Sequence, residues 1–138
     1  MNGKAFVDTN VFIYLYSVDE NEKRLRAENA LENYECIIST QTLNEFSNFC
    51  IKKWKLTPSA VSSAVTEMCT ACTVKYVDEN TVLQALEIHE RYGYSFYDCL
   101  MLASALTNGC IYIFSEDMAD GQIINGALEI VNIFRREV

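Results

Sequence analysis

Residues 5–14 read AFVDTNVFIY, and this stretch decides the fold. Its first three residues are apolar and predict a buried strand, whereas Thr9 and Asn10 are typical of the start of a helix. Asp8 lies at the junction, beside the expected core, where an unpaired charge is costly. Something must compensate the Asp8 carboxylate, and we expect a divalent metal to do so, held together with three later acids.

The composition indicates a globular chain. It has 138 residues, half of them apolar, and its single proline and five glycines mark no linker. We therefore expect one domain over residues 1–138. No stretch approaches the ~20 apolar residues of a membrane helix, and residues 1–8 do not resemble a secretory signal. Six cysteines lie mostly in apolar segments, so buried free thiols and a cytoplasmic location are expected.

The net charge of −8 opposes bulk attraction to nucleic acid. It does not exclude a nuclease, because a cluster of metal-binding acids would contribute much of that charge. Any affinity for nucleic acid must then come from a local basic patch, a metal or a partner chain.

Apolar runs alternate with segments of helical spacing along the chain. Strands are expected at residues 4–7, 36–39, 73–77, 110–114 and 129–133, and residues 121–126 as irregular or a short helix. Helices are expected at residues 9–18, 22–34, 40–54, 58–70, 78–92 and 97–108. Thr9 or Asn10 is the expected cap of the first helix, and Thr40 that of the third.

This order predicts an α/β fold. Strands that are apolar throughout and alternate with helices indicate a mainly parallel sheet of about five strands, covered on both faces as a three-layer α/β/α sandwich. Ligands of such sheets bind beyond the carboxyl ends of the strands, where the strand order switches.

Four acids stand next to these apolar elements: Asp8, Glu45, Asp98 and Asp117. Three have ordinary explanations when taken singly, since Asp98 suits a helix N-terminus, Glu45 a solvated helix surface and Asp117 a turn. Together they can converge on one edge of the sheet. Four such carboxylates repel one another, so they take up protons or bind a cation. All-oxygen ligation suits Mg²⁺ or Mn²⁺.

Four blocks of sequence carry a resemblance to a known family. They are FVDTNVFIY at 6–14, ISTQTLNEF at 38–46, YDCLMLASA at 97–105 and FSEDM at 114–118. In this order they resemble a PIN domain, and more narrowly the VapC-type toxins of toxin–antitoxin modules. The resemblance spans essentially the whole chain.

The resemblance implies a Mg²⁺- or Mn²⁺-dependent endoribonuclease that hydrolyses RNA phosphodiester bonds. It implies an acidic quartet of Asp8, Glu45, Asp98 and Asp117, supported by Thr9, Asn10 and Ser115. Glu116 and Asp120 flank Asp117, so three acids compete for the fourth position. The family also implies a homodimer and a small antitoxin that blocks the site.

The mechanism we expect uses water as the nucleophile. Asp8, Asp98 and Asp117 hold metal directly or through water, and Glu45 holds a second metal or orients the attacking water. A basic run, Lys52, Lys53 and Lys55, surrounds Trp54 and is either a contact for RNA phosphates or a solvated helix end.

Two other functions compete with this one. A haloacid-dehalogenase-like phosphohydrolase would use Asp8 as a nucleophile, but Asn10 stands where its general acid belongs. A non-catalytic binding module of the same fold is the other, and four mutually repelling carboxylates argue against it.

Overall fold

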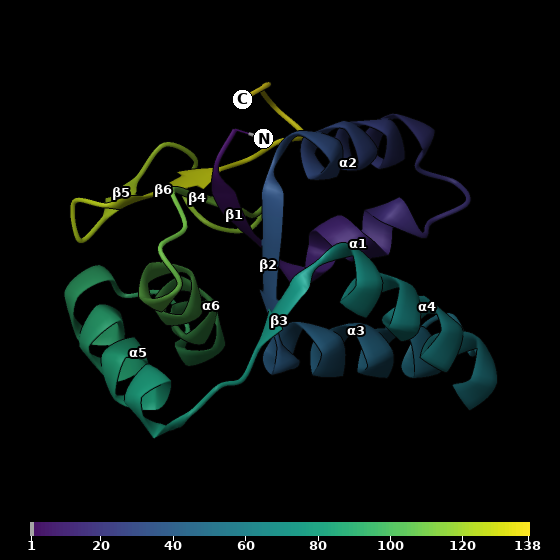
Figure 1. Ribbon diagram of the computed structural model, residues 1–138, viewed down its shortest axis with the longest axis horizontal. Helices are drawn as coiled ribbons and strands as arrows, with labels where there is room; N and C mark the ends of the chain where they lie inside the picture. Colours follow the sequence, from purple (N-terminus) through teal and green to yellow (C-terminus); the bar gives the residue numbers. More distant parts are fainter. Residues whose placement is uncertain (1) are drawn as a thin grey trace.

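The computed structural model describes residues 2–138 and is built on one six-stranded sheet (Figure 1). The strand order is β3-β2-β1-β4-β6-β5. Five strands are parallel, namely β1 (Lys4–Val7), β2 (Glu35–Ser39), β3 (Thr73–Lys75), β4 (Tyr112–Phe114) and β6 (Leu128–Val131). The sixth, β5 (Ile123–Ile124), pairs antiparallel with β6 at one edge.

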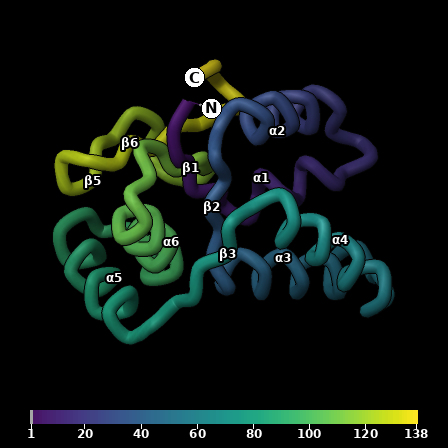
Figure 2. Tube along the Cα trace, viewed as in Figure 1, coloured from purple at the N-terminus to yellow at the C-terminus, as the bar shows by residue number. Residues whose placement is uncertain are grey.

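Helices cover both faces of the sheet, as Figure 2 shows along the chain trace. One face carries α1 (Thr9–Leu15), α2 (Asn21–Asn33), α3 (Thr40–Lys52) and α4 (Pro58–Ala71). The other carries α5 (Glu79–Tyr92) and α6 (Phe96–Thr107). The predicted three-layer α/β fold is confirmed.

Alternating side chains of the central strands build two cores. Val7 of β1 and Phe114 of β4 pack with helices α1–α4, whereas Phe6 and Ile113 pack with α5 and α6. Because successive side chains of a strand point to opposite faces, a strand that is apolar throughout can serve both cores. All four side chains are fully buried.

Two helix starts differ from the sequence prediction. Asp8, rather than Thr9 or Asn10, is the N-cap of α1, and its carboxylate accepts from the Thr9 backbone N–H at 2.7 Å. Ser39, rather than Thr40, is the N-cap of α3. Both caps therefore lie earlier in the chain than expected. Ser39 is the last residue of β2 and Asp8 directly follows β1, so each N-cap lies where the strand ends. Helix α1 ends at Leu15 instead of continuing to residue 18.

The segment at residues 121–126 was predicted to be irregular or a short helix, and that prediction is wrong. It holds β5, which raises the strand count to six. Asn125 and Gly126 have positive φ angles of 51° and 70° and reverse the chain, so that Ile124 pairs with Leu128. Asn-Gly between apolar residues is a hairpin signal that the sequence already contained.

All six cysteines are free thiols, and only Cys69 is exposed. Within residues 2–138, no helix combines the length and the apolarity needed to cross a membrane.

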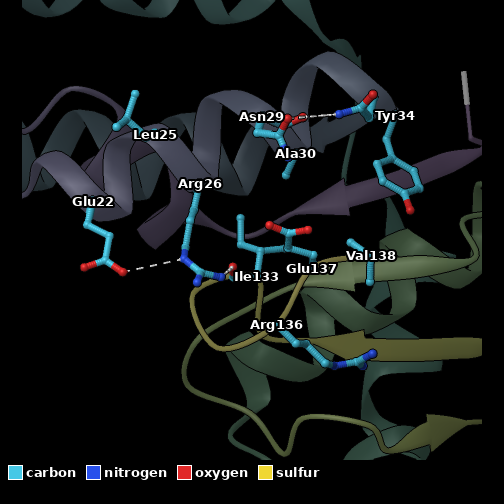
Figure 3. A pocket seen from close by; sticks show the side chains of 11 residues that line it. Glu22, Leu25, Arg26, Asn29, Ala30, Tyr34, Ile133, Arg136, Glu137 and Val138 are labelled. Atoms are coloured by element: carbon cyan, nitrogen blue, oxygen red, sulfur yellow. Dashed lines mark hydrogen bonds and ion pairs between the residues drawn. The ribbon is translucent and has the colours of Figure 1, made fainter.

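The C-terminal segment lies beside α2, and side chains of both line a hollow of about 430 Å³. Figure 3 shows these side chains. Arg26 there donates to the Ile133 carbonyl at 3.2 Å, and Arg136 pairs with Asp120 and Glu129. Arg136 is therefore neutralised by two acids, and Arg26 is held by a backbone carbonyl.

Candidate metal-binding site

Four acids line one cavity at the carboxyl ends of the strands. The strand order switches at β1, which lies between β2 and β4, and ligands of open α/β sheets bind at such a switch. The cavity measures about 330 Å³, and its lining includes Asp8, Glu45, Asp98 and Asp117. The fold thus brings together four residues that stand up to 109 positions apart in the sequence.

Asp8 lies deepest, with 6% of its surface exposed. It follows β1 directly, and its backbone N–H donates to the Phe114 carbonyl at the end of β4 at 3.1 Å. One carboxylate oxygen accepts from Thr9 N–H and the other from the Ser115 hydroxyl, at 3.0 Å. Burial nevertheless raises the pKa of Asp8 from 3.8 to about 7, against the effect of these hydrogen bonds. The Asp98 and Glu45 carboxylates add to the rise.

Glu45 extends from α3 toward the N-terminus of α1. The Thr9 hydroxyl donates to its Oε1 at 2.8 Å, and the Gln41 amide donates to its Oε2 at 2.9 Å. Gln41 and Glu45 share one face of α3 because they are four residues apart. That spacing is the signal by which the sequence could have shown Gln41 as a site residue, and it was missed.

Asp98 occupies the first turn of α6, whose N-cap is Ser95. The Ser95 hydroxyl accepts from the Asp98 backbone N–H at 3.2 Å. Burial raises the pKa of Asp98, a hydrogen bond with Ser95 opposes the rise, and the Asp117 and Glu45 carboxylates increase it. The helix dipole therefore favours the ionised form of Asp98, whereas the anionic neighbours disfavour it.

The structure separates the three acids that competed for the fourth position. Asp117 lines the cavity and accepts from the Asn10 amide at 2.6 Å. Glu116 turns away and pairs with Lys23 and the Tyr14 hydroxyl, both at 2.6 Å. Burial would raise the pKa of Glu116, but these two hydrogen bonds hold it below its usual value.

Asp120 also lies outside this cavity's lining. It accepts from the Asn132 backbone N–H at 2.9 Å and pairs with Arg136 at 3.1 Å. Those contacts, led by the backbone N–H, lower the pKa of Asp120. Both alternatives to Asp117 are thus compensated by nearby cations, whereas Asp117 is not.

None of the ion pairs found among residues 2–138 includes an acid of the quartet. Their hydrogen-bond donors are neutral, from Thr9, Asn10, Gln41 and Ser115. In the orientations that these donors impose, no three acidic, histidine or cysteine side chains of residues 2–138 are grouped closely enough to hold an ion. The donor set still fits a hard divalent cation, because carboxylate oxygens are its preferred ligands and a buried, uncompensated Asp8 requires positive charge.

Two of the three lysines in the basic run reach the cavity. Lys52 and Lys53, at the C-terminus of α3, line it, and Lys55 does not. Lys55 has a positive φ of 56° in the turn that follows the helix. The lining of the cavity therefore contains four acids and two lysines, an arrangement that can hold a cation and a phosphate together.

The chain is similar to a known family and to several solved structures. A family model described as the PIN domain matches residues 5–119. No curated protein matches the chain in sequence. Among solved structures, a sarcin–ricin-loop-cleaving toxin of Mycobacterium tuberculosis, VapC20, is 21% identical with a TM-score of 0.67, and the match covers 82% of this chain and 89% of that one.

Two toxin–antitoxin assemblies are also similar. A complex from Klebsiella pneumoniae is 20% identical with a TM-score of 0.72, covering 94% of this chain and 97% of that one. A DNA-bound VapBC complex from Salmonella typhimurium is 22% identical with a TM-score of 0.66, covering 92% and 97%. At these identities the likeness shows a shared fold.

Proposed function

The chain belongs to the PIN domain family, and from this premise we propose that it is a metal-dependent endoribonuclease that hydrolyses RNA phosphodiester bonds as the toxin of a toxin–antitoxin pair. The observation that best supports the proposal is the cavity of four acids without a cationic partner, with a buried Asp8 whose pKa is raised to about 7. A bound divalent cation would offset this buried charge and the repulsion among the four carboxylates.

Mg²⁺ or Mn²⁺ would be held by Asp8, Asp98 and Asp117, directly or through water, with Glu45 as a further ligand or as the group that orients the attacking water. When bound, such an ion polarises a phosphoryl oxygen and makes bound water more acidic. Ser115 and Thr9 hold the Asp8 carboxylate in place. Thr9 and Gln41 hold the Glu45 carboxylate, which would accept a proton from the attacking water.

Lys52 and Lys53 have a role on the substrate side. Both are exposed and line the cavity of the acids, so they are placed to contact phosphates beside the scissile one. Their charge offsets the repulsion between the acidic site and the RNA backbone. The rival phosphohydrolase mechanism lacks its general acid, because the Asn10 side chain is an amide that donates to Asp117.

The test is cleavage of a structured RNA with Mg²⁺ by the wild type and by Asp8→Asn. Wild type is expected to cleave and Asp8→Asn to lose at least about a hundredfold in rate, since one ligand and one buried charge are removed. Glu116→Gln is the matched control, because this adjacent acid faces Lys23 and should keep activity. Equal metal-dependent cleavage by Asp8→Asn would overturn the assignment.

The proposed antitoxin has a candidate docking surface. A groove of about 570 Å³ between α1, α3 and α4 is lined by Phe46, Trp54 and Leu56, with Asp19 and Glu67 as its acidic members. This chemistry suits an apolar helix that carries basic residues. Two of the similar solved structures are toxin–antitoxin assemblies, which supports an antitoxin as the occupant.

The docking test uses the product of a short reading frame next to this gene as the proposed antitoxin. It is expected to co-purify with wild type and with Leu25→Glu, an exposed apolar position outside the groove, and not with Leu56→Glu. Equal capture by all three would remove the groove from the proposal.

We also propose a cytoplasmic homodimer, for which sedimentation equilibrium should give twice the chain mass of 15.7 kDa. A measured mass of 15.7 kDa would contradict it.

A further inference from the structure

A second hollow shares Glu45 with the metal-binding cavity. It measures about 380 Å³ and is lined by Gln41 and Asn44 of α3, Val77, and Tyr97 and Leu100 of α6. Lys52 and Lys53 line the first cavity and not this one. A strand of RNA that places a phosphate at the acids therefore has a second recess next to it, whose lining contains no lysine or arginine.

Gln41 lines this hollow and carries an unsatisfied acceptor. Its side chain is 8% exposed, and its Nε2 donates to Glu45 Oε2 and to the Tyr97 carbonyl, both at 2.9 Å. Because both partners can only accept, the nitrogen and oxygen of the amide are assigned without ambiguity. The remaining atom, Oε1, is buried and has no donor among residues 2–138. A buried acceptor without a donor is costly, so a ligand that supplies an N–H gains from binding here.

Tyr97 supplies an aromatic surface to the same hollow. Tyr97 is 65% exposed although it belongs to the largely buried helix α6, and its ring contacts Phe96 edge-on at 5.6 Å between centroids. Its backbone carbonyl is held by Gln41. The hollow shares Glu45 with the metal-binding cavity, so a flat group stacked on this ring would lie next to the proposed reaction centre.

We propose that this hollow binds one unpaired base of the RNA next to the cleaved phosphodiester, and that it selects a base with an exocyclic amino group. The Tyr97 ring stacks on the base, Val77 and Leu100 contact it through apolar atoms, and Gln41 Oε1 accepts from the amino group. The inference rests on the proposed ribonuclease function and names the feature of the substrate that this site reads.

The direction of selectivity follows from the polar groups in the hollow. Gln41 Oε1 and the Glu45 carboxylate can only accept, whereas the Asn44 amide can also donate. The two fixed acceptors favour a base edge that donates and repel one that accepts. Adenine and cytosine present an amino group on the edge where uracil presents a carbonyl oxygen. Since that edge is free only when the base is unpaired, the site is suited to a loop or a single strand.

The test measures binding and cleavage separately. Asp8→Asn protein, in which cleavage is suppressed, is titrated with 5′-labelled pentanucleotides of adenosine and of purine riboside, which lacks only the amino group. The adenosine RNA is expected to bind about 5-fold more tightly, the cost of leaving one buried acceptor unpaired. Adding Tyr97→Ala should weaken binding by about 5- to 30-fold, and Tyr97→Phe should retain it.

Tyr76→Ala is the matched control, because Tyr76 is 83% exposed and outside the lining of the hollow. In wild-type background, Tyr97→Ala should raise KM for a cleaved RNA and leave kcat nearly unchanged. If wild type cleaves RNA while the two pentanucleotides bind equally and Tyr97→Ala matches Tyr76→Ala, the base site is overturned and the ribonuclease stands. If the binding differences appear but wild type cleaves no RNA, the base site stands and the ribonuclease proposal fails.

Discussion

The buried Asp8 carboxylate makes the metal-free protein sensitive to pH in a way that Asp8→Asn removes. The pKa of Asp8 is raised from 3.8 to about 7 in the folded state, chiefly by burial. A carboxyl group with a raised folded pKa binds its proton more tightly when folded. The stabilisation from that proton is therefore fully present below pH 3.8 and is lost as the pH rises to about 7.

The size of the effect follows from the shift. A rise from 3.8 to about 7 corresponds to a loss of about 4 kcal/mol of unfolding free energy across this interval. Asn keeps an oxygen that can accept from Thr9 N–H and an amide that can donate to the Ser115 hydroxyl, so the local contacts survive while the charge does not. We therefore expect Asp8→Asn to be more stable than wild type at pH 8 in the absence of metal.

The assay is urea unfolding followed by circular dichroism in EDTA, from pH 4 to pH 8, for wild type and Asp8→Asn. The difference between their unfolding free energies should change by about 2–4 kcal/mol over this range. Adding Mg²⁺ at pH 8 should stabilise wild type, by about 2.7 kcal/mol at a hundred times its Kd, and should do much less for the variant.

Glu116→Gln is the control, because the pH dependence of the stability that Glu116 contributes has the opposite sign to that of Asp8. The carboxyl pKa of Glu116 is lowered in the fold, so the stabilisation from this group is present above its unfolded pKa and is lost as the pH falls. Parallel stability profiles for wild type and Asp8→Asn in EDTA would refute the claim that Asp8 is a buried, uncompensated charge.

Two further predictions concern the cavity. Lys52→Glu combined with Lys53→Glu should weaken RNA binding by about tenfold, because two phosphate contacts are removed, whereas Lys55→Glu should change binding little. Filter binding at fixed salt measures these affinities. Equal losses of affinity in the two proteins would contradict the proposed phosphate contact. Ser115→Ala removes a hydrogen bond that lowers the pKa of Asp8, so the acid limb of the Mg²⁺-dependent pH–rate profile should move up by about one pH unit. An unmoved acid limb would show that Ser115 does not tune Asp8.

Local sequence patterns were sufficient for the fold class and for most helices and strands. Apolar runs such as residues 5–7 and 112–114 predict strands because burial on both faces leaves no room for polar side chains. The helix that begins at Pro58 was placed correctly because a Thr cap followed by proline is a local signal. The cap of α1 was placed one or two residues late and that of α3 one residue late, since capping depends on where the strand stops as well as on residue type.

The sequence by itself also determined that Asp8, Glu45 and Asp98 stand beside buried elements, because each acid interrupts or borders an apolar pattern. Only the tertiary structure shows that Asp117, and neither Glu116 nor Asp120, lines the cavity of the other three acids. Their neighbours in the chain are similar, and the difference lies in partners such as Lys23, which is 93 residues from Glu116.

The unpaired oxygen of Gln41 likewise has no local signal. It exists because Tyr97, 56 residues away, and Glu45 both take the amide nitrogen of that side chain. Periodicity and residue type are properties of a short stretch of chain, so they predict secondary structure and the positions of candidate acids. The pairing of charges and the satisfaction of hydrogen bonds are properties of residues brought together by folding, and they decide which acids and amides are left to bind a ligand.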